Sequence, residues 1–188
     1  MNNRKPFARV YIYGDDFNLA GFAFTEVGDV VRPVGSFQSS GFIETTVDDM
    51  LSTIAADYTI TELIVPPEPE GQPNKLLELM PDSYTTKVAS TDPTYPICCT
   101  ERAIALHNGK LKEDDYKGRT KLLERLRQVD ADKPASALLW AYLRGLYELL
   151  KKKPSYGSVY VGGNLKTLGL SKRRNIFGAV KDPSHIRW

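Results

Sequence analysis

Acidic residues stand in pairs at the ends of three stretches of this sequence that are rich in apolar residues. The pairs are Asp15 and Asp16, Glu68 and Glu70, and Asp130 and Asp132. Carboxylate oxygens are the ligands that Mg²⁺ and Mn²⁺ prefer, and no histidine is suitably placed to favour another metal. Two such ions could activate a water and stabilise the leaving oxygen of a phosphodiester. The pattern therefore predicts a metal site, although acidic residues are also ordinary caps at the ends of helices and strands.

The first acidic pair follows a predicted strand, and two more strands come after it. The β-branched and aromatic run from Ala8 to Tyr13 ends at a glycine and is typical of a strand. The runs from Gly21 to Val27 and from Val30 to Phe37 are joined by Gly28-Asp29, which is a strong hairpin signal. Pro33 favours an edge position for the third strand. These features predict an antiparallel meander of three strands.

The second pair follows a short buried strand that is reached through a helix. Apolar residues recur at helical spacing from Val47 to Tyr58. The run from Glu62 to Val65 is then stopped by two prolines. Because a helix connects this strand to the earlier ones, we expect it to pair in parallel with one of them. A short helix over 74–80 and a fifth strand over 84–89 complete this half of the chain.

The third pair precedes the last and longest of three predicted helices. These helices cover Thr100 to Leu106, Arg119 to Val129 and Ala135 to Leu150. Asp132 is a candidate cap of the last helix. From residue 154 to residue 188 the apolar pattern loses its period, which predicts an extension that packs on the body or orders on a partner. We therefore expect one domain over 1–153 and a basic C-terminal extension over 154–188.

Positive charge is concentrated toward the end of the chain, although the net charge of all 188 residues is only +2. Cations that could neutralise the phosphates of a nucleic acid lie in one predicted helix and in the extension. They are Arg119, Lys121, Arg125 and Arg127, together with Lys172, Arg173 and Arg174. For the helical set a solvated face is the alternative interpretation. The cluster in the extension lies in a loosely patterned segment with little structural role, so it favours nucleic-acid binding more strongly than the helical set does.

Two further features of the sequence indicate the cellular compartment of the protein. Cys98 and Cys99 are adjacent, and adjacent residues rarely reach the geometry of a disulfide, so we expect reduced thiols. A vicinal redox pair or half of a metal site is the alternative. The first residues lack the apolar core of a signal peptide, and no apolar stretch approaches the roughly 20 residues needed to cross a bilayer. We therefore expect a cytoplasmic location, in a cell or in an infected host cell.

The predicted order of elements resembles the ribonuclease H-like fold, and the local sequence looks most like RuvC-type resolvases and the nuclease domains of phage large terminases. The stretch from Tyr11 to Phe24 is similar to that family's first motif, in which an apolar strand, a glycine, an aspartate and a short loop lead to a glycine that opens the second strand. On this match the first metal-binding aspartate of the family falls on Asp16, with Asp15 the near alternative.

Two later motifs extend the resemblance over residues 8–150. The stretch from Leu63 to Gly71 resembles the fourth strand of the family, whose end bears a metal-bridging glutamate; Glu68 is the nearer match. The stretch from Val129 to Leu139 looks like the last acidic motif. Here the sequence departs from the family, which has an aspartate directly before the Ala-Leu pair where this chain has Ser136. Asp132 could supply that ligand from one turn earlier.

The resemblance implies an α/β fold with a mixed five-stranded sheet, three antiparallel strands and then parallel ones, flanked by helices. It implies a metal-dependent endonuclease that cleaves DNA, plausibly phage-encoded, with Asp16, Glu68 and Asp132 as catalytic residues and Mg²⁺ or Mn²⁺ as cofactor. A homodimer, or assembly with other phage proteins, is compatible with it. Ser136 favours an alternative, a catalytically inactive domain that serves as a nucleic-acid-binding or assembly module. A third interpretation is a structural protein whose acidic pairs are caps.

Overall fold

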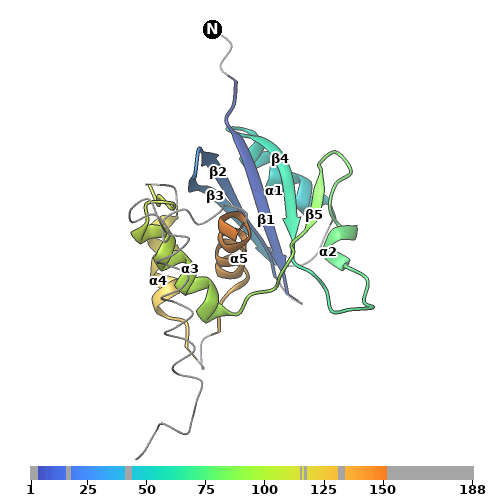
Figure 1. The fold of residues 1–188 in the computed structure, drawn as a ribbon. Helices are drawn as coiled ribbons and strands as arrows, with labels where there is room; N and C mark the ends of the chain where they lie inside the picture. The colour runs from blue at the N-terminus through green and yellow to red at the C-terminus, as the bar shows by residue number, and fades with distance from the viewer. Residues whose placement is uncertain are drawn as a thin grey trace, which may run out of the picture. The chain divides into compact units, whose positions relative to one another are not determined.

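A mixed sheet organises the part of the chain that the computed structural model describes, which is residues 4–15, 18–40, 44–114, 116, 118–130 and 134–151 (Figure 1). Its strands are β1 (Phe7–Gly14), β2 (Asn18–Val27), β3 (Val30–Ser40), β4 (Thr59–Val65) and β5 (Thr86–Val88), in the spatial order β3-β2-β1-β4-β5. The first three pair antiparallel, and β4 lies parallel to both β1 and β5. The predicted five-stranded mixed sheet is therefore confirmed, and the carboxyl ends of β1, β4 and β5 lie at the same end of the sheet.

Two local signals in the sequence act as expected. Gly28 has a φ of +59° in the turn between β2 and β3, a conformation that glycine adopts without steric cost. Pro33 lies in β3, which is an edge strand. Near the start of β3, the segment after the third helix pairs with Val31: Val31 N–H donates to Lys110 C=O over 2.8 Å, and Lys112 N–H donates to Val31 C=O over 3.0 Å.

Helices cover both faces of the sheet (Figure 1). One face carries α1 (Glu44–Ala55) and α2 (Lys75–Glu78), and the other carries α3 (Tyr95–His107), α4 (Arg119–Arg127) and α5 (Ala137–Lys151). The predicted start of α3 at Thr100 was wrong, because the helix begins at Tyr95. Pro96 stands in its first turn, where the missing N–H has no intrahelical partner to lose.

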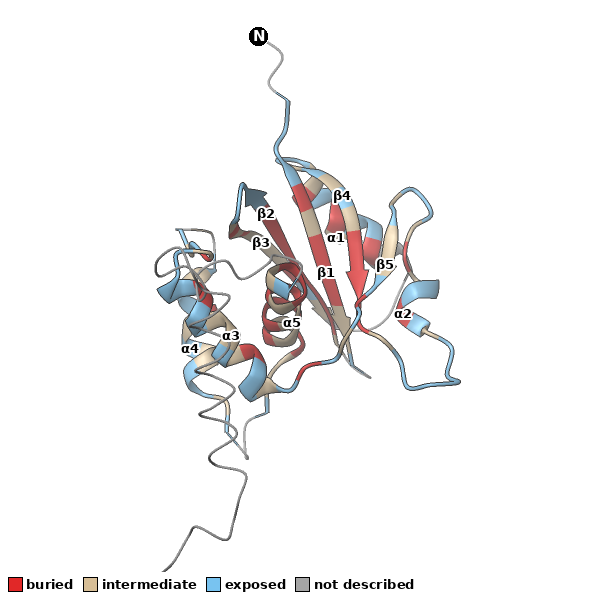
Figure 2. Ribbon diagram, viewed as in Figure 1, coloured by how far each residue is buried: buried red, intermediate tan, exposed pale blue. Residues whose placement is uncertain are grey.

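The core on the α5 side is aromatic. Tyr11, Phe22, Phe24 and Tyr142 are fully buried, and Figure 2 shows the buried residues running along the central strands and α5. Gly145 lets α5 approach the sheet closely, since a Cβ there would lie 2.7 Å from both Phe24 and Tyr11 side-chain atoms. Helix α5 is therefore seated in a fixed register on β1 and β2.

The core on the opposite face is aliphatic. It joins alternate residues of β1 and β4 to the inner face of α1, for example Val10, Leu63 and Leu51. Because side chains alternate across a strand, Tyr11 and Tyr13 of β1 face α5 while Val10 and Ile12 face α1. This alternation decides which side chains reach the carboxyl end of the sheet on the α5 side.

Several sequence predictions fall outside the described residues. Asp16, Asp132 and the whole basic extension are among them, so the division into 1–153 and 154–188 stays a prediction. Within the described ranges, no helix combines the length and the apolar character that a bilayer span requires. The cytoplasmic location likewise stays a prediction.

Candidate functional site

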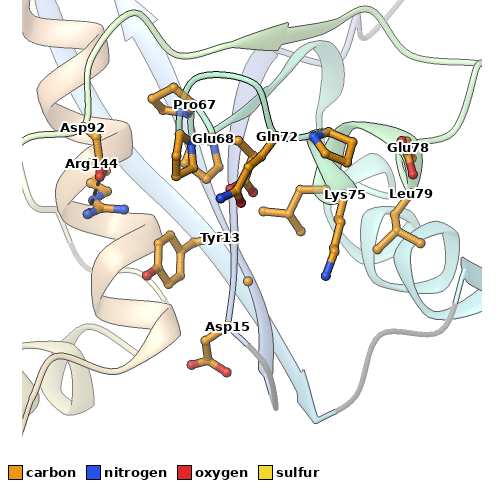
Figure 3. Close-up of a pocket in the computed structure, with 15 residues that line it drawn as sticks. Tyr13, Asp15, Pro67, Glu68, Gln72, Lys75, Glu78, Leu79, Asp92 and Arg144 are labelled. Atoms are coloured by element: carbon orange, nitrogen blue, oxygen red, sulfur yellow. Dashed lines mark ion pairs between the residues drawn. The ribbon is translucent and has the colours of Figure 1, made fainter.

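A pocket of about 770 Å³ opens where the parallel strands end (Figure 3). Its walls come from the end of β1, the loop after β4, α2, the segment after β5 and α5. The charged and aromatic residues that line it are Tyr13, Asp15, Glu68, Lys75, Glu78, Asp92 and Arg144. The chain thus brings Asp15, the alternative to Asp16 in the predicted ligand set, and Glu68 to one pocket. Glu70 and Asp130 do not line it.

Asp15 is fixed by the turn between β1 and β2. Its Oδ1 accepts a hydrogen bond from the N–H of Asn18 over 2.7 Å and a second from Asn18 Nδ2 over 3.2 Å. The N–H of Asp15 donates in turn to the C=O of Asn18 over 2.9 Å. In Figure 3 the Asp15 side chain points away from the loop that carries Glu68. These hydrogen bonds therefore hold the Asp15 carboxylate in the turn between β1 and β2.

Glu68 lies in a loop that is closed by one asparagine. Asn74 Nδ2 donates to the C=O of Pro66 over 2.9 Å, and Asn74 Oδ1 accepts from the N–H of Leu77 over 3.0 Å. Asn74 thus ties the start of the loop to the cap of α2. The Glu68 side chain itself is exposed at the rim of the pocket.

Helix α5 contributes an arginine to the pocket. Arg144 Nη2 lies 2.7 Å from Asp92 Oδ1, and the Arg144 side chain is only 12% exposed. The guanidinium carbon lies 4.1 Å from the centroid of the Trp140 ring and 5.1 Å from that of Tyr13. Contacts of this kind between a cation and an aromatic face are attractive and strengthen when water is excluded. Burial raises the pKa of Tyr13 in spite of the opposing charge of Arg144.

Asp92, the ion-pair partner of Arg144, lies in a segment that is bonded to α5. Ser90 Oγ donates to Glu148 Oε2 over 3.1 Å, one turn beyond Arg144, and Glu148 is almost completely buried. Lys151 Nζ lies 3.5 Å from the same Ser90 oxygen. The segment after β5 is therefore attached to α5 at two points, which positions Asp92 beside the guanidinium.

Ser136 occupies the position where the resemblance implies an aspartate, and it directly precedes α5. Its Oγ accepts from the N–H of Leu139 over 3.4 Å, and its C=O accepts from the N–H of Trp140 over 2.9 Å. These are the contacts of an N-cap residue, so this position serves the helix start. Arg144 follows about two turns further along the helix.

The described part of the site does not fit a carboxylate metal centre. Among these residues, no three acidic, histidine or cysteine side chains gather closely enough to hold an ion. Asp15 is hydrogen-bonded into a turn, and Asp92 is paired with Arg144. A cation brought to the pocket would have to compete with both arrangements.

Asp92 and Arg144 were missed by the sequence reasoning. A signal for Asp92 was available, since it follows the predicted strand 84–89 just as Asp15 and Glu68 follow theirs. Arg144 lies at helical spacing from Ser136, but only the register of α5 on the sheet turns it toward the pocket. That register depends on packing at Gly145 and the aromatic core.

Helix α4 carries the described cations of the predicted nucleic-acid interface. Arg119, Lys121, Arg125 and Arg127 share its nine residues with one acidic residue, Glu124. Arg125 Nη1 donates to Gln38 Oε1 of β3 over 3.3 Å, which places this helix beside the β3 edge of the sheet. The other predicted cations, Lys172, Arg173 and Arg174, lie outside the described residues.

Solved structures with a similar arrangement include two viral terminases and a viral resolvase. The large terminase of a thermophilic bacteriophage is 13% identical, with a TM-score of 0.57 over 80% of this chain and 41% of that chain. The manganese-soaked terminase nuclease domain of human cytomegalovirus is 12% identical, with a TM-score of 0.52 over 78% of this chain and 86% of that one. A fowlpox virus resolvase, solved with Holliday junction DNA, is a weaker likeness, with a TM-score of 0.48 at 12% identity over 77% of this chain and 97% of its own.

These likenesses show the fold. The chain has the ribonuclease H-like fold, as the order of its elements implies. It spans 41% of the length of the phage terminase. No protein-family model matches the sequence, and no curated protein does.

Proposed function

We propose that this chain is a ribonuclease H-like module that binds DNA through the α4 side of the sheet and does not depend on a carboxylate metal centre. The observation that most directly supports independence from a metal centre is the Arg144–Asp92 pair, which neutralises an acidic residue inside the pocket. Ser136 supports it as well, because the position of the implied third acidic ligand caps a helix here. The fold that the chain shares with viral nucleases supports a nucleic-acid partner.

The charge on α4 supports the binding surface. Its four cations and one acidic residue give this short helix a net positive charge. Each phosphate that a protein cation neutralises releases counterions from the DNA. For every such phosphate, the logarithm of the binding constant falls by about 0.9 for each tenfold rise in salt concentration. Binding through α4 therefore has a salt signature.

The test is DNA binding at several salt concentrations by the whole chain and by two variants. The double variant Lys121→Gln with Arg127→Gln removes two cations of α4 and should reduce the salt slope by about 2 on duplex DNA. Lys87→Gln on β5, at the opposite edge of the sheet from α4, is the matched control and should leave the slope unchanged. An equal loss in both variants, or no binding by the unmodified chain, would contradict the proposal.

A second candidate function is metal-dependent cleavage of DNA. The observation that favours it is the presence of Asp15 and Glu68 at one pocket, although they come from remote parts of the sequence. Asp16 and Asp132, the other proposed ligands, lie outside the described residues. Mg²⁺ or Mn²⁺ bound by such residues would supply Lewis-acid activation of a phosphodiester. Under this candidate the chain is a resolvase-like or terminase-nuclease-like endonuclease encoded by a phage.

One cleavage assay separates the two candidates. Branched, linear duplex and single-stranded DNA are incubated with the chain in Mg²⁺ or Mn²⁺, alongside Asp16→Asn, Glu68→Gln and Asp132→Asn variants. Cleavage that these substitutions abolish establishes the endonuclease; binding without cleavage supports the module. Sedimentation of the same samples shows whether the chain forms the homodimer that a resolvase would need.

A further inference from the structure

We propose that Arg144 is a permanent cation of the pocket, which supplies there the positive charge that a bound divalent ion would otherwise supply. The pocket would consequently bind divalent ions poorly as long as this guanidinium is present. The inference concerns the charge of the pocket and holds whether or not α4 binds DNA. It rests on the position, the contacts and the burial of one side chain.

Arg144 is surrounded by groups that stabilise a positive charge. At 2.7 Å between Arg144 Nη2 and Asp92 Oδ1, the guanidinium and the carboxylate form a close ion pair. The rings of Trp140 and Tyr13 lie within cation–π distance of the same group. One carboxylate and two aromatic faces therefore stabilise the charge where it stands.

The surroundings of Arg144 also hold its side chain in place. Its side chain is only 12% exposed, whereas the Asp92 side chain is half exposed. Trp140 is itself packed edge-on against Tyr95, at 6.1 Å between ring centroids. A divalent ion that displaced the guanidinium would have to break its contacts with the Trp140 and Tyr13 rings.

Arg144 also changes the balance of charge in the pocket. Among the described residues that line the pocket, four are acidic, namely Asp15, Glu68, Glu78 and Asp92, and two are cations, Lys75 and Arg144. Carboxylates that lie close together repel one another unless a cation neutralises them. With Arg144 in place Asp92 is neutralised, and the Asp15 carboxylate accepts hydrogen bonds from Asn18. The chain itself thus satisfies two of the four carboxylates that could attract an added ion.

The test is a titration of the whole chain with Mn²⁺. Binding is measured by electron paramagnetic resonance, which reports free Mn²⁺, and by quenching of tryptophan fluorescence. The unmodified chain should show no saturable binding at micromolar Mn²⁺. Arg144→Met keeps the bulk of the stem and releases Asp92, so its affinity for Mn²⁺ should rise by about tenfold or more, because a like charge has been removed from the site. Adding Asp92→Asn to this variant should abolish the gain.

A charge-preserving variant controls for a purely structural effect. Arg144→Lys alters the packing between Trp140 and Tyr13 but keeps a cation, and should bind Mn²⁺ as poorly as the unmodified chain. Equal Mn²⁺ affinity in the methionine and lysine variants overturns the proposal. Saturable micromolar binding by the unmodified chain, weakened by Glu68→Gln, also overturns it, and this measurement decides the matter even where Arg144→Met fails to fold.

Discussion

A buried polar network joins three segments on the α5 side of the sheet. Arg102 of α3 donates from Nε and Nη2 to the two carboxylate oxygens of Glu113, over 2.8 and 2.6 Å. Tyr142 of α5 donates its hydroxyl to the same carboxylate. The Glu113 side chain is 6% exposed, so its charge depends on these partners. Such a bidentate pair fixes the loop after α3 against α5.

Replacing Arg102 by methionine should therefore destabilise the chain considerably. The substitution leaves a buried carboxylate without its countercharge, a situation that costs on the order of 3 kcal/mol. Urea unfolding followed by circular dichroism measures the loss. Arg127→Met on α4 removes an exposed arginine and should change the free energy of unfolding by less than about 0.5 kcal/mol. Similar stabilities for the two variants would contradict this account of Glu113.

At the scale of elements, the sequence predicted the sheet well because its strands are marked by strong local signals. Gly28-Asp29 marked the hairpin, and the two prolines after Val65 marked the end of β4. The start of α3 could not be read in the same way, because Pro96 is a helix breaker in most positions and is tolerated only in a first turn.

The site was predictable only in part. The pair Asp15 and Asp16 and the residue Glu68 were predicted to follow strands that end together, with Asp16 favoured over Asp15 as the ligand. The pairing of Arg144 with Asp92 was not predictable, because it depends on how far α5 is shifted and turned on the sheet. A shift of one turn would present Trp140 or Glu148 in place of Arg144, and no pattern in the sequence of α5 distinguishes these registers.

The close approach of α5 to the sheet gives a prediction for Gly145. Alanine is a better helix former by about 1 kcal/mol, but its Cβ would lie 2.7 Å from atoms of Tyr11 and Phe24. Overpacking of this kind costs about 1–3 kcal/mol, so we expect Gly145→Ala to lower the midpoint of urea unfolding. Lys121→Ala on α4 lies away from this contact and should leave the midpoint nearly unchanged. A Gly145→Ala variant that is more stable would show that α5 can move.

At the scale of the whole molecule, the aromatic core makes stability sensitive to alkali. Burial raises the pKa of Tyr11, Tyr116 and Tyr142, and it raises that of Cys98 to about 11. Each group is protonated in the fold and, in the unfolded chain, loses its proton near the ordinary values of 9.0 for cysteine and 10.0 for tyrosine. The stability that these groups contribute is therefore complete below about pH 9 and is lost as the pH rises toward their raised values.

We accordingly expect the thermal midpoint to be level from about pH 7 to about pH 9 and to fall steadily above it. The part of the tyrosinate absorbance that comes from Tyr11, Tyr116 and Tyr142 should appear together with unfolding and not before it, since buried phenols ionise only when the fold opens. A midpoint that stays level up to about pH 11, or tyrosinate that forms from these buried groups in the folded chain, would contradict this expectation.

The pairing of Lys110 and Lys112 with Val31 has a consequence for self-association. A strand that exposes its backbone N–H and C=O groups can recruit another chain and start aggregation, and natural sheets cover or interrupt such strands. Here both backbone groups of Val31 are occupied by the segment after α3. Opening that segment, for instance by loss of the Arg102–Glu113 pair nearby in the chain, would free them and should make the protein prone to intermolecular β-pairing as well as less stable.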